Sequence, residues 1–79
     1  MISNELAARY YLPPIENYPF PELDWYTTFL KQTDYVSYKI AEALYLNEEI
    51  DNDYSEVLQA RKYARQKVNE LRGQLCLQK

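Results

Sequence analysis

The stretch that decides the fold is DYVSYKIAEALYL, residues 34–46. Its apolar side chains recur at the spacing of one helical face: Val36, Ile40, Ala43 and Leu44. This pattern predicts an amphipathic helix over residues 34–46. Thr33 and Asp34 are typical of a new helix N-cap, or of a kink if one helix continues through them.

A second helical stripe follows towards the C-terminus, with members spaced alternately by three and four residues: Tyr54, Val57, Arg61, Ala64, Val68, Leu71 and Leu75. This is the spacing of a coiled-coil seam, and Arg61 is its single polar member. Packing against residues 34–46 explains the stripe equally well. We expect an antiparallel hairpin of residues 34–46 and 54–72, ended by Gly73. Self-association through residues 54–75 is the alternative.

Towards the N-terminus, four prolines lie between residues 13 and 21. They remove backbone donors and favour extended geometry, which predicts a strap from Leu12 to Pro21. Before it, Ser3 is a candidate N-cap for a short helical segment. After it, residues 21–32 carry apolar side chains at helical spacing: Leu23, Tyr26, Phe29 and Leu30. We expect a short helix there, with Ile40 and Val68 buried in the hairpin that follows.

The expected fold is therefore all-α: a small helical domain with an antiparallel helical hairpin and an extended Pro-rich N-terminal strap. A chain of 79 residues forms one domain. Its expected parts are an arm and strap (1–21), a helical region (22–46), an acidic loop (47–53), a long helix (54–72) and a tail (73–79).

The composition argues against an enzyme, because the chain has no histidine, one cysteine and one glycine. It lacks a zinc ligand set, a base to activate Cys76, and a glycine-rich phosphate loop. The segment from Asp51 to Asp53 resembles the opening of a calcium loop, but Glu56 and Lys62 replace the required glycine and final carboxylate. We expect no catalytic residue, no cofactor and no metal.

The chain shows neither a leader peptide nor a run of about 18 apolar residues, so we expect no membrane segment. A reducing cytoplasm is the expected compartment. The formal net charge of −3 also argues against direct binding of nucleic acid.

Charge is distributed unevenly along the chain. Residues 1–53 hold three bases and ten acids, whereas residues 54–79 hold six bases and two acids. These charges either complement each other within the chain or place a basic face against an acidic partner. Residues 42–56 contain acids and no base.

Nine tyrosines give the chain large contact areas with few rotatable bonds. Tyr38 and Tyr45 lie off the apolar stripe, so they either pack the strap or face a partner. An acidic, aromatic surface also suits imitation of nucleic acid better than binding it. The candidate partner-binding residues are Trp25, Tyr38, Tyr45, Glu48, Glu49, Asp51 and Asp53.

One further pattern consists of Thr33-Asp34-Tyr35-Val36, Lys39-Ile40-Ala41-Glu42-Ala43, Tyr54, Val57-Leu58, Arg61, Arg65 and Val68-Asn69-Glu70-Leu71. It covers about residues 30–72 and resembles a pattern in small helical proteins of tailed phages and prophages, often encoded near tail or tail-fibre genes. Val68 replaces the usual isoleucine of that family.

The resemblance implies a non-catalytic role in tail or tail-fibre assembly, with a phage structural protein as partner. It places the chain in the host bacterial cytoplasm or the virion. The alternative is a phage-encoded, anti-CRISPR-like inhibitor that blocks a host defence protein with its acidic, tyrosine-rich surface.

Overall fold

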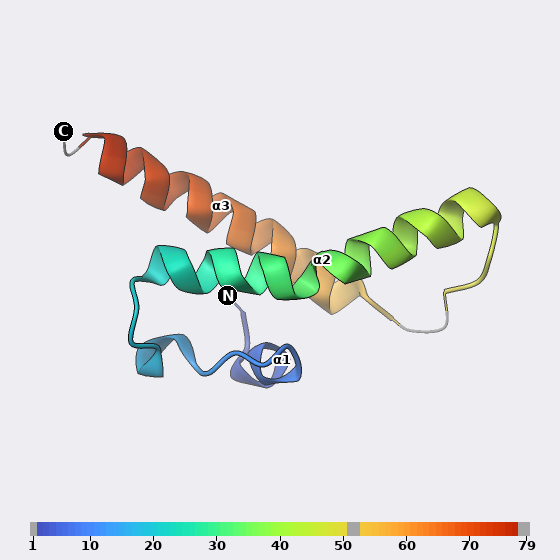
Figure 1. The fold of residues 1–79 in the computed structure, drawn as a ribbon, viewed down its shortest axis with the longest axis horizontal. Coiled ribbons are helices and arrows are strands. Elements are labelled where there is room, and N and C mark those ends of the chain that lie inside the picture. Colours follow the sequence, from blue (N-terminus) through green and yellow to red (C-terminus); the bar gives the residue numbers. More distant parts are fainter. Residues whose placement is uncertain (1, 51–52, 78–79) are drawn as a thin grey trace.

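The computed structural model describes residues 2–50 and 53–77, and within these ranges it contains helices and no strand. In chain order they are α1 (Asn4–Arg9), a 3₁₀ turn (Ile15–Asn17), α2 (Glu22–Leu46) and α3 (Ser55–Leu77). The two long helices pack against each other, and the N-terminal segment lies along the other side of α2 (Figure 1). The predicted all-α fold with a helical hairpin is confirmed.

The N-terminal segment follows the prediction with one difference. The Ser3 side chain caps α1 by accepting a hydrogen bond from the Leu6 N–H at 3.2 Å. The strap is not extended throughout, because the proline-free residues 15–17 form the 3₁₀ turn, which starts with an Asn17 N–H bond to the Pro14 carbonyl at 3.0 Å.

Helix α2 is continuous, so the expected start of a second helix at Thr33 is wrong, and the alternative of one helix that bends there fits the structure. Thr33 is fully buried, and its hydroxyl donates to the Phe29 carbonyl at 2.8 Å, one turn back. This bond satisfies the side chain that would otherwise cap a new helix. Threonines bonded in this way often bend helices, and Figure 1 shows the axis of α2 changing direction near its middle.

Helix α3 is longer than the expected 54–72, because it continues through Gly73 to Leu77. Gly73 does not adopt a positive φ, so it is not a C′ residue. A glycine inside a helix costs only about 1 kcal/mol relative to alanine, which the neighbouring helix-forming residues offset.

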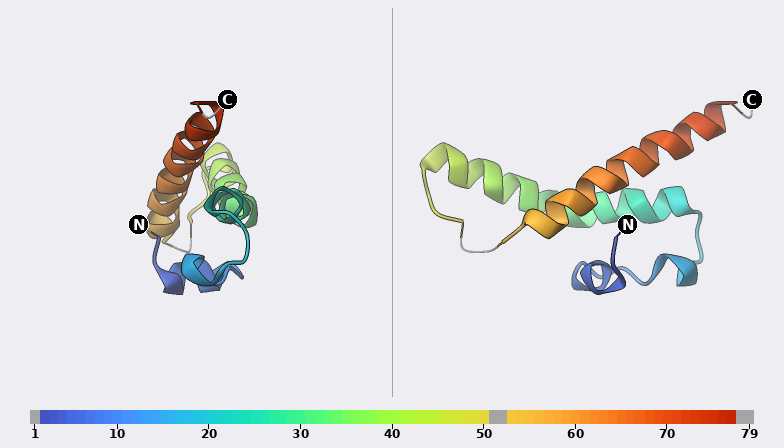
Figure 2. Two further views of the ribbon diagram at one scale, coloured as in Figure 1. Left: turned by 90° about the vertical axis from the view of Figure 1, so that its left-hand side faces the viewer. Right: turned by 180° about the vertical axis from the view of Figure 1, so that it is seen from behind.

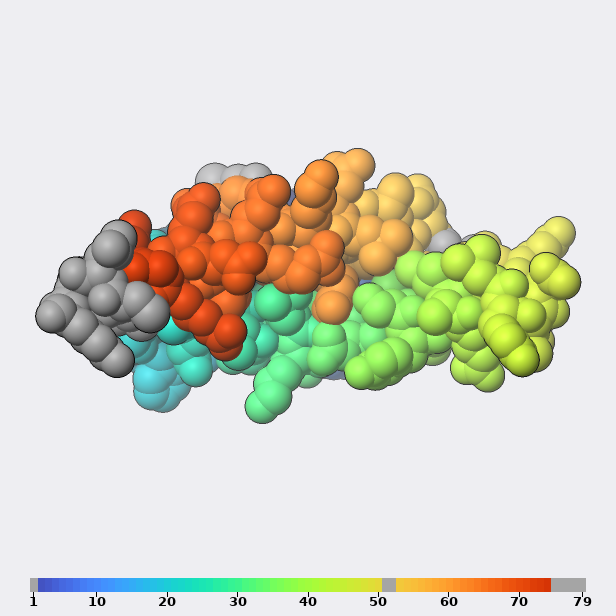
Figure 3. All heavy atoms as spheres, turned by 90° about the horizontal axis from the view of Figure 1, so that it is seen from above, coloured from blue at the N-terminus to red at the C-terminus, as the bar shows by residue number. Residues whose placement is uncertain are grey.

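The two long helices cross rather than run side by side along their whole length. Helix α3 begins beside the middle of α2 and then diverges from it (Figures 1 and 2). The last turns of α2 therefore extend past the start of α3, as the yellow-green end does in Figure 3. The result is an elongated molecule of 48 × 25 × 16 Å.

The core lies where α1, the strap, the first two-thirds of α2 and the middle of α3 meet. Its buried apolar residues are Ile2, Leu6, Ala7, Leu12, Trp25, Tyr26, Phe29, Val36, Val57, Ala60, Ala64 and Val68. Val68 is buried as expected, but Ile40 is only half-buried and Leu44 is exposed. These two expectations fail because α3 does not extend alongside the last turns of α2.

Trp25 fixes the strap to α2. Its indole N–H donates to the Pro13 carbonyl at 2.9 Å. The ring lies parallel to that of Phe29 with centroids 5.9 Å apart, and Tyr10 packs edge-on against Phe29. Tyr26 packs edge-on against Trp25 and contacts Tyr63 of α3. Burial, followed by interactions with Tyr63, raises the pKa of Tyr26 to about 12.

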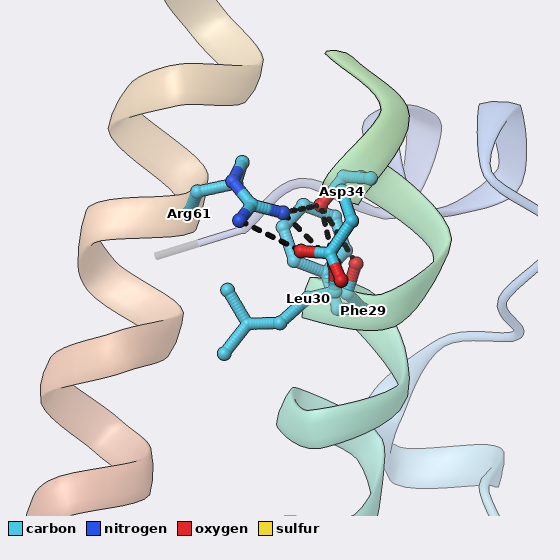
Figure 4. Close-up of polar contacts among 5 residues, drawn as sticks. Phe29, Leu30, Asp34 and Arg61 are labelled. Carbon is cyan, nitrogen blue, oxygen red and sulfur yellow. Dashed lines mark hydrogen bonds and ion pairs between the residues drawn. The ribbon is translucent and has the colours of Figure 1, made fainter. Parts of the chain in front are cut away.

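Arg61 joins α3 to the middle of α2 (Figure 4). Its Nη1 donates to the Leu30 carbonyl at 2.8 Å and to the Thr33 hydroxyl at 2.6 Å. Its Nη2 donates to Asp34 at 3.0 Å. The buried Nε makes no hydrogen bond within the described residues. The polar member of the α3 stripe therefore serves as an internal link between the helices.

Tyr11 and Asn47 end their helices in the left-handed conformation, with φ of 66° and 56°. After α1, Tyr11 N–H donates to the Ala8 carbonyl and Leu12 N–H to the Ala7 carbonyl. The equivalent two bonds end α2 around Asn47. Both ends are Schellman motifs, in which glycine is preferred, asparagine is tolerated and tyrosine is strained.

We therefore expect Tyr11→Gly to raise the free energy of unfolding by about 0.5–1 kcal/mol, because the tyrosine side chain is 87% exposed and its left-handed backbone is strained. Urea unfolding measures the change. Asn47→Gly is the matched control, and it should raise the free energy of unfolding by less. A lower midpoint for Tyr11→Gly would show that its exposed ring stabilises the fold.

Candidate functional site

The last turns of α2, residues 38–46, carry exposed large side chains and are called the projecting arm here. They include Tyr38, Leu44, Tyr45 and Leu46. Tyr38 and Tyr45 are seven positions apart and therefore lie on one helix face, 71% and 87% exposed. The alternative that these two tyrosines pack against the strap is wrong, because the strap lies beside the other half of α2.

Acidic side chains surround the tyrosines of the projecting arm. Glu42 is four residues after Tyr38 and three before Tyr45, which makes it their neighbour on the helix surface. Glu48 and Glu49 follow the end of α2, and both are exposed. We call Glu42, Glu48, Glu49 and Asp53 the acidic rim. Asp51 lies outside the described residues.

An open cavity of about 300 Å³ lies between the end of α2 and the residues that precede α3. It is lined by Lys39, Glu42, Ala43, Glu48, Glu49, Ile50 and Tyr54. The Lys39 ammonium lies 5.5 Å from the centre of the Tyr35 ring, a cation–π contact within α2. The cavity thus lies among three carboxylates and one lysine.

Asp53 has a local structural role as well as a charge. Its carboxylate accepts a hydrogen bond from the Ser55 N–H at 2.9 Å, at the start of α3. The backbone and side-chain bonds from Ser55 lower the pKa of Asp53 below its usual value. Its negative charge is therefore kept at neutral pH.

Trp25 is a core residue and not part of the surface, so its expected role in partner binding is wrong. Its side chain is 2% exposed and lies between the strap and α2. An indole four residues after Pro21 fits a partner-binding site and a core anchor equally well. Only the path of the strap across α2 distinguishes the two.

The bases of α3 do not neutralise the acidic rim. In the described residues, the ion pairs between different segments join Arg9 to Glu56 at 3.9 Å and Arg61 to Asp34 at 3.0 Å. Neither includes Glu42, Glu48 or Glu49. The unequal charges of the two parts of the chain are therefore mostly exposed rather than paired internally.

The described residues offer little for a metal site or a membrane-spanning helix. Among the described side chains, those of residues 2–50 and 53–74, no three acidic groups gather closely enough to hold a metal ion. The side chain of Cys76 lies outside the described side chains. None of the described helices combines the length and apolar character needed to cross a bilayer. The arrangement offers aromatic contact area next to negative charge.

Helical periodicity did not predict three exposed apolar side chains on the arm or just after it: Leu44, Leu46 and Ile50. Leu44 is in phase with Val36 and Ile40, which suggested burial. What distinguishes Leu44 from Val36 is the position of α3, because α3 begins beside the middle of α2 and not beside its last turns.

No family model matches the chain, and no curated protein or solved structure shows significant similarity to it.

Proposed function

We propose that this chain is a non-catalytic protein-binding protein and that it binds its partner with the projecting arm and the acidic rim. The observation that supports this most is the high exposure of Tyr38 and Tyr45 on one face of α2. Tyrosine is among the residue types most often found as binding hot spots, and here two stand clear of the core.

The acidic rim indicates the charge of the partner. Glu42, Glu48 and Glu49 are exposed and unpaired with any base among the described residues. Complementary charge accelerates association, while buried aromatic contacts slow dissociation. A protein with a basic surface is therefore the partner that we propose.

The tailed-phage resemblance supplies the first setting, namely assembly of the tail or tail fibre with a phage structural protein. The second setting is inhibition of a host defence protein, and the acidic rim favours it specifically. A groove that tracks a nucleic-acid backbone is basic and aromatic-lined, and an acidic tyrosine-bearing helix complements such a groove. The neighbouring genes, either tail genes or early anti-defence genes, distinguish the settings.

A photo-crosslinking experiment tests the binding surface. A benzophenone amino acid at Tyr38 or Tyr45 should crosslink the full chain to one discrete protein in host cells. The same group at Tyr11 is the control, because Tyr11 is as exposed as Tyr45 but belongs to the N-terminal segment. Equal crosslinking from Tyr11 and Tyr45 would contradict a binding role of the arm.

With the captured partner purified, association kinetics test the division of roles. Replacing Glu48, Glu49, Asp51 and Asp53 with Ser should slow association and flatten its dependence on salt. Tyr45→Ala should mainly speed dissociation, and Tyr11→Ala should change neither rate. If the variant without these acids associates like the parent at low and high salt, electrostatic steering by the acidic rim is wrong.

A further inference from the structure

A groove lies at the opposite end of the molecule from the projecting arm, between the first half of α2 and the second half of α3. Its volume is about 270 Å³, and it is lined by Thr27, Leu30, Arg65, Val68, Asn69 and Arg72. Arg65 and Arg72 are exposed, and neither forms an ion pair within the described part of the chain. We call this feature the basic groove.

The basic groove is too small for a drug-sized ligand, but it suits one or two side chains of another protein. Leu30 and Val68 contribute its apolar lining, and the two arginines supply cations that stack on aromatic rings and pair with carboxylates. Its chemistry therefore calls for a segment that combines aromatic rings with negative charge.

The projecting arm has this composition in the matching spacing. On α2, Tyr38, Glu42 and Tyr45 are separated by four and then three residues. On α3, Arg65, Asn69 and Arg72 are separated in the same way. Each set occupies one row of a helix surface about 10 Å long.

Aligned in the same direction, the two rows place an arginine opposite each tyrosine and the Asn69 amide opposite the Glu42 carboxylate. Cation–π contacts and a charge-assisted hydrogen bond would then join them.

The arm and the groove cannot meet within one copy, because they lie at opposite ends of a molecule 48 Å long (Figure 1). We propose that the projecting arm of one copy docks in the basic groove of a second copy. This contact differs from self-association through the α3 stripe, whose Val57, Ala64 and Val68 are buried within the chain. This contact uses the same arm as the function proposed above. It does not depend on that function, since it needs no other protein.

Such a contact is heterologous, so it builds a ring where the rotation closes and an open chain of copies where it does not. Each junction uses a few helical turns, which predicts weak, concentration-dependent association rather than a permanent dimer.

Sedimentation velocity on the purified full-length chain tests the proposal. At about 0.05 M salt the mean mass should rise with protein concentration, and at about 1 M salt it should return to the monomer value, because salt screens the charges. A parent chain that remains monomeric at millimolar concentration and low salt overturns the proposal.

Charge reversal identifies the two surfaces. Glu42→Lys on the arm with Glu48→Lys just after it, or Arg65→Glu with Arg72→Glu in the groove, should each abolish association. Mixing these two double variants should give a dimer and nothing larger, because only one intact arm and one intact groove remain.

The variant with all four reversals keeps the parent charge of −3 but places carboxylates opposite Tyr38 and Tyr45, so it should remain monomeric. Association of this variant, with the fold retained by circular dichroism, would contradict the proposed pairing.

A matched control separates location from net charge. Lys31→Glu with Lys62→Glu makes the same change in net charge as the groove variant, but neither lysine lines the groove. The control should retain association, and equal loss in both variants would overturn the proposal. The crosslinking test of the proposed function uses cells and a different readout, so failure of one leaves the other intact.

Discussion

Replacing Phe29 with Ala is expected to lower the free energy of unfolding by about 3–5 kcal/mol. Phe29 has no exposed surface, and its ring contacts those of Trp25 and Tyr10. The truncation removes contacts of α2 with the end of α1 and with Trp25, which holds the strap through Pro13. Because a small domain has roughly 5–15 kcal/mol of stability, this single change should leave the chain near its folding threshold. Urea unfolding followed by circular dichroism measures the loss.

Tyr38→Ala is the matched control, since it removes an aromatic ring from the same helix. Tyr38 is 71% exposed, so we expect a change below about 0.5 kcal/mol. Similar losses in the two variants would mean that the projecting arm also belongs to the core, and would contradict the division of α2 into a packed and a free part.

Arg61→Ala should lower the free energy of unfolding by about 2–4 kcal/mol. The guanidinium donates to the Leu30 carbonyl, the Thr33 hydroxyl and the Asp34 carboxylate, and the residue is 8% exposed. The change removes these bonds and leaves a gap in the contact between α2 and α3. Denaturant unfolding at neutral pH measures it.

Arg61→Met separates the packing of the side chain from its hydrogen bonds. Methionine fills most of the same space, and Thr33 keeps its bond to the Phe29 carbonyl, so that hydroxyl remains satisfied. Removing one partner of an ion pair is costly where the other charge stays buried, but the Asp34 side chain is 45% exposed and can be solvated without Arg61. We therefore expect Arg61→Met to recover most of the loss. An equal loss in the Met and Ala variants would contradict this, because it would assign the stability to the polar bonds.

The sequence predicted which segments are helical better than it predicted where each helix begins and ends. Periodicity shows which face of a helix is apolar, whereas the residues at a helix end are compatible with more than one boundary. Thr33 resembles an N-cap, yet it bonds to the Phe29 carbonyl and accepts from Arg61 on another helix. Gly73 resembles a C′ residue, but nothing packs against it to end α3 there. The contact from Arg61 to Thr33 spans 28 residues of sequence, so no local pattern reports it. At Gly73 no such contact ends the helix.

The candidate site was predicted in part for the same reason. Tyr38 and Tyr45 were correctly separated from the apolar stripe by helical phase alone. The phase of Leu44 matches that of Val36, but Val36 is buried and Leu44 is exposed, because α3 begins beside the middle of α2 and not beside its last turns. Helical phase does not tell whether Trp25 is a core residue or an exposed ring. The hydrogen bond from its indole to the Pro13 carbonyl shows that it is a core residue. Periodicity gives the direction of a side chain, and only the crossing of the helices says what lies in that direction.

The confinement of the core to one part of α2 has a consequence for how this protein changes over generations. Substitutions in residues 38–46 remove few buried contacts, and sites that share no partners contribute to stability almost independently. The arm is therefore open to mutational drift that the packed half of the same helix does not tolerate. A lineage under pressure to recognise a new partner can alter these residues one at a time and keep a folded chain at each step.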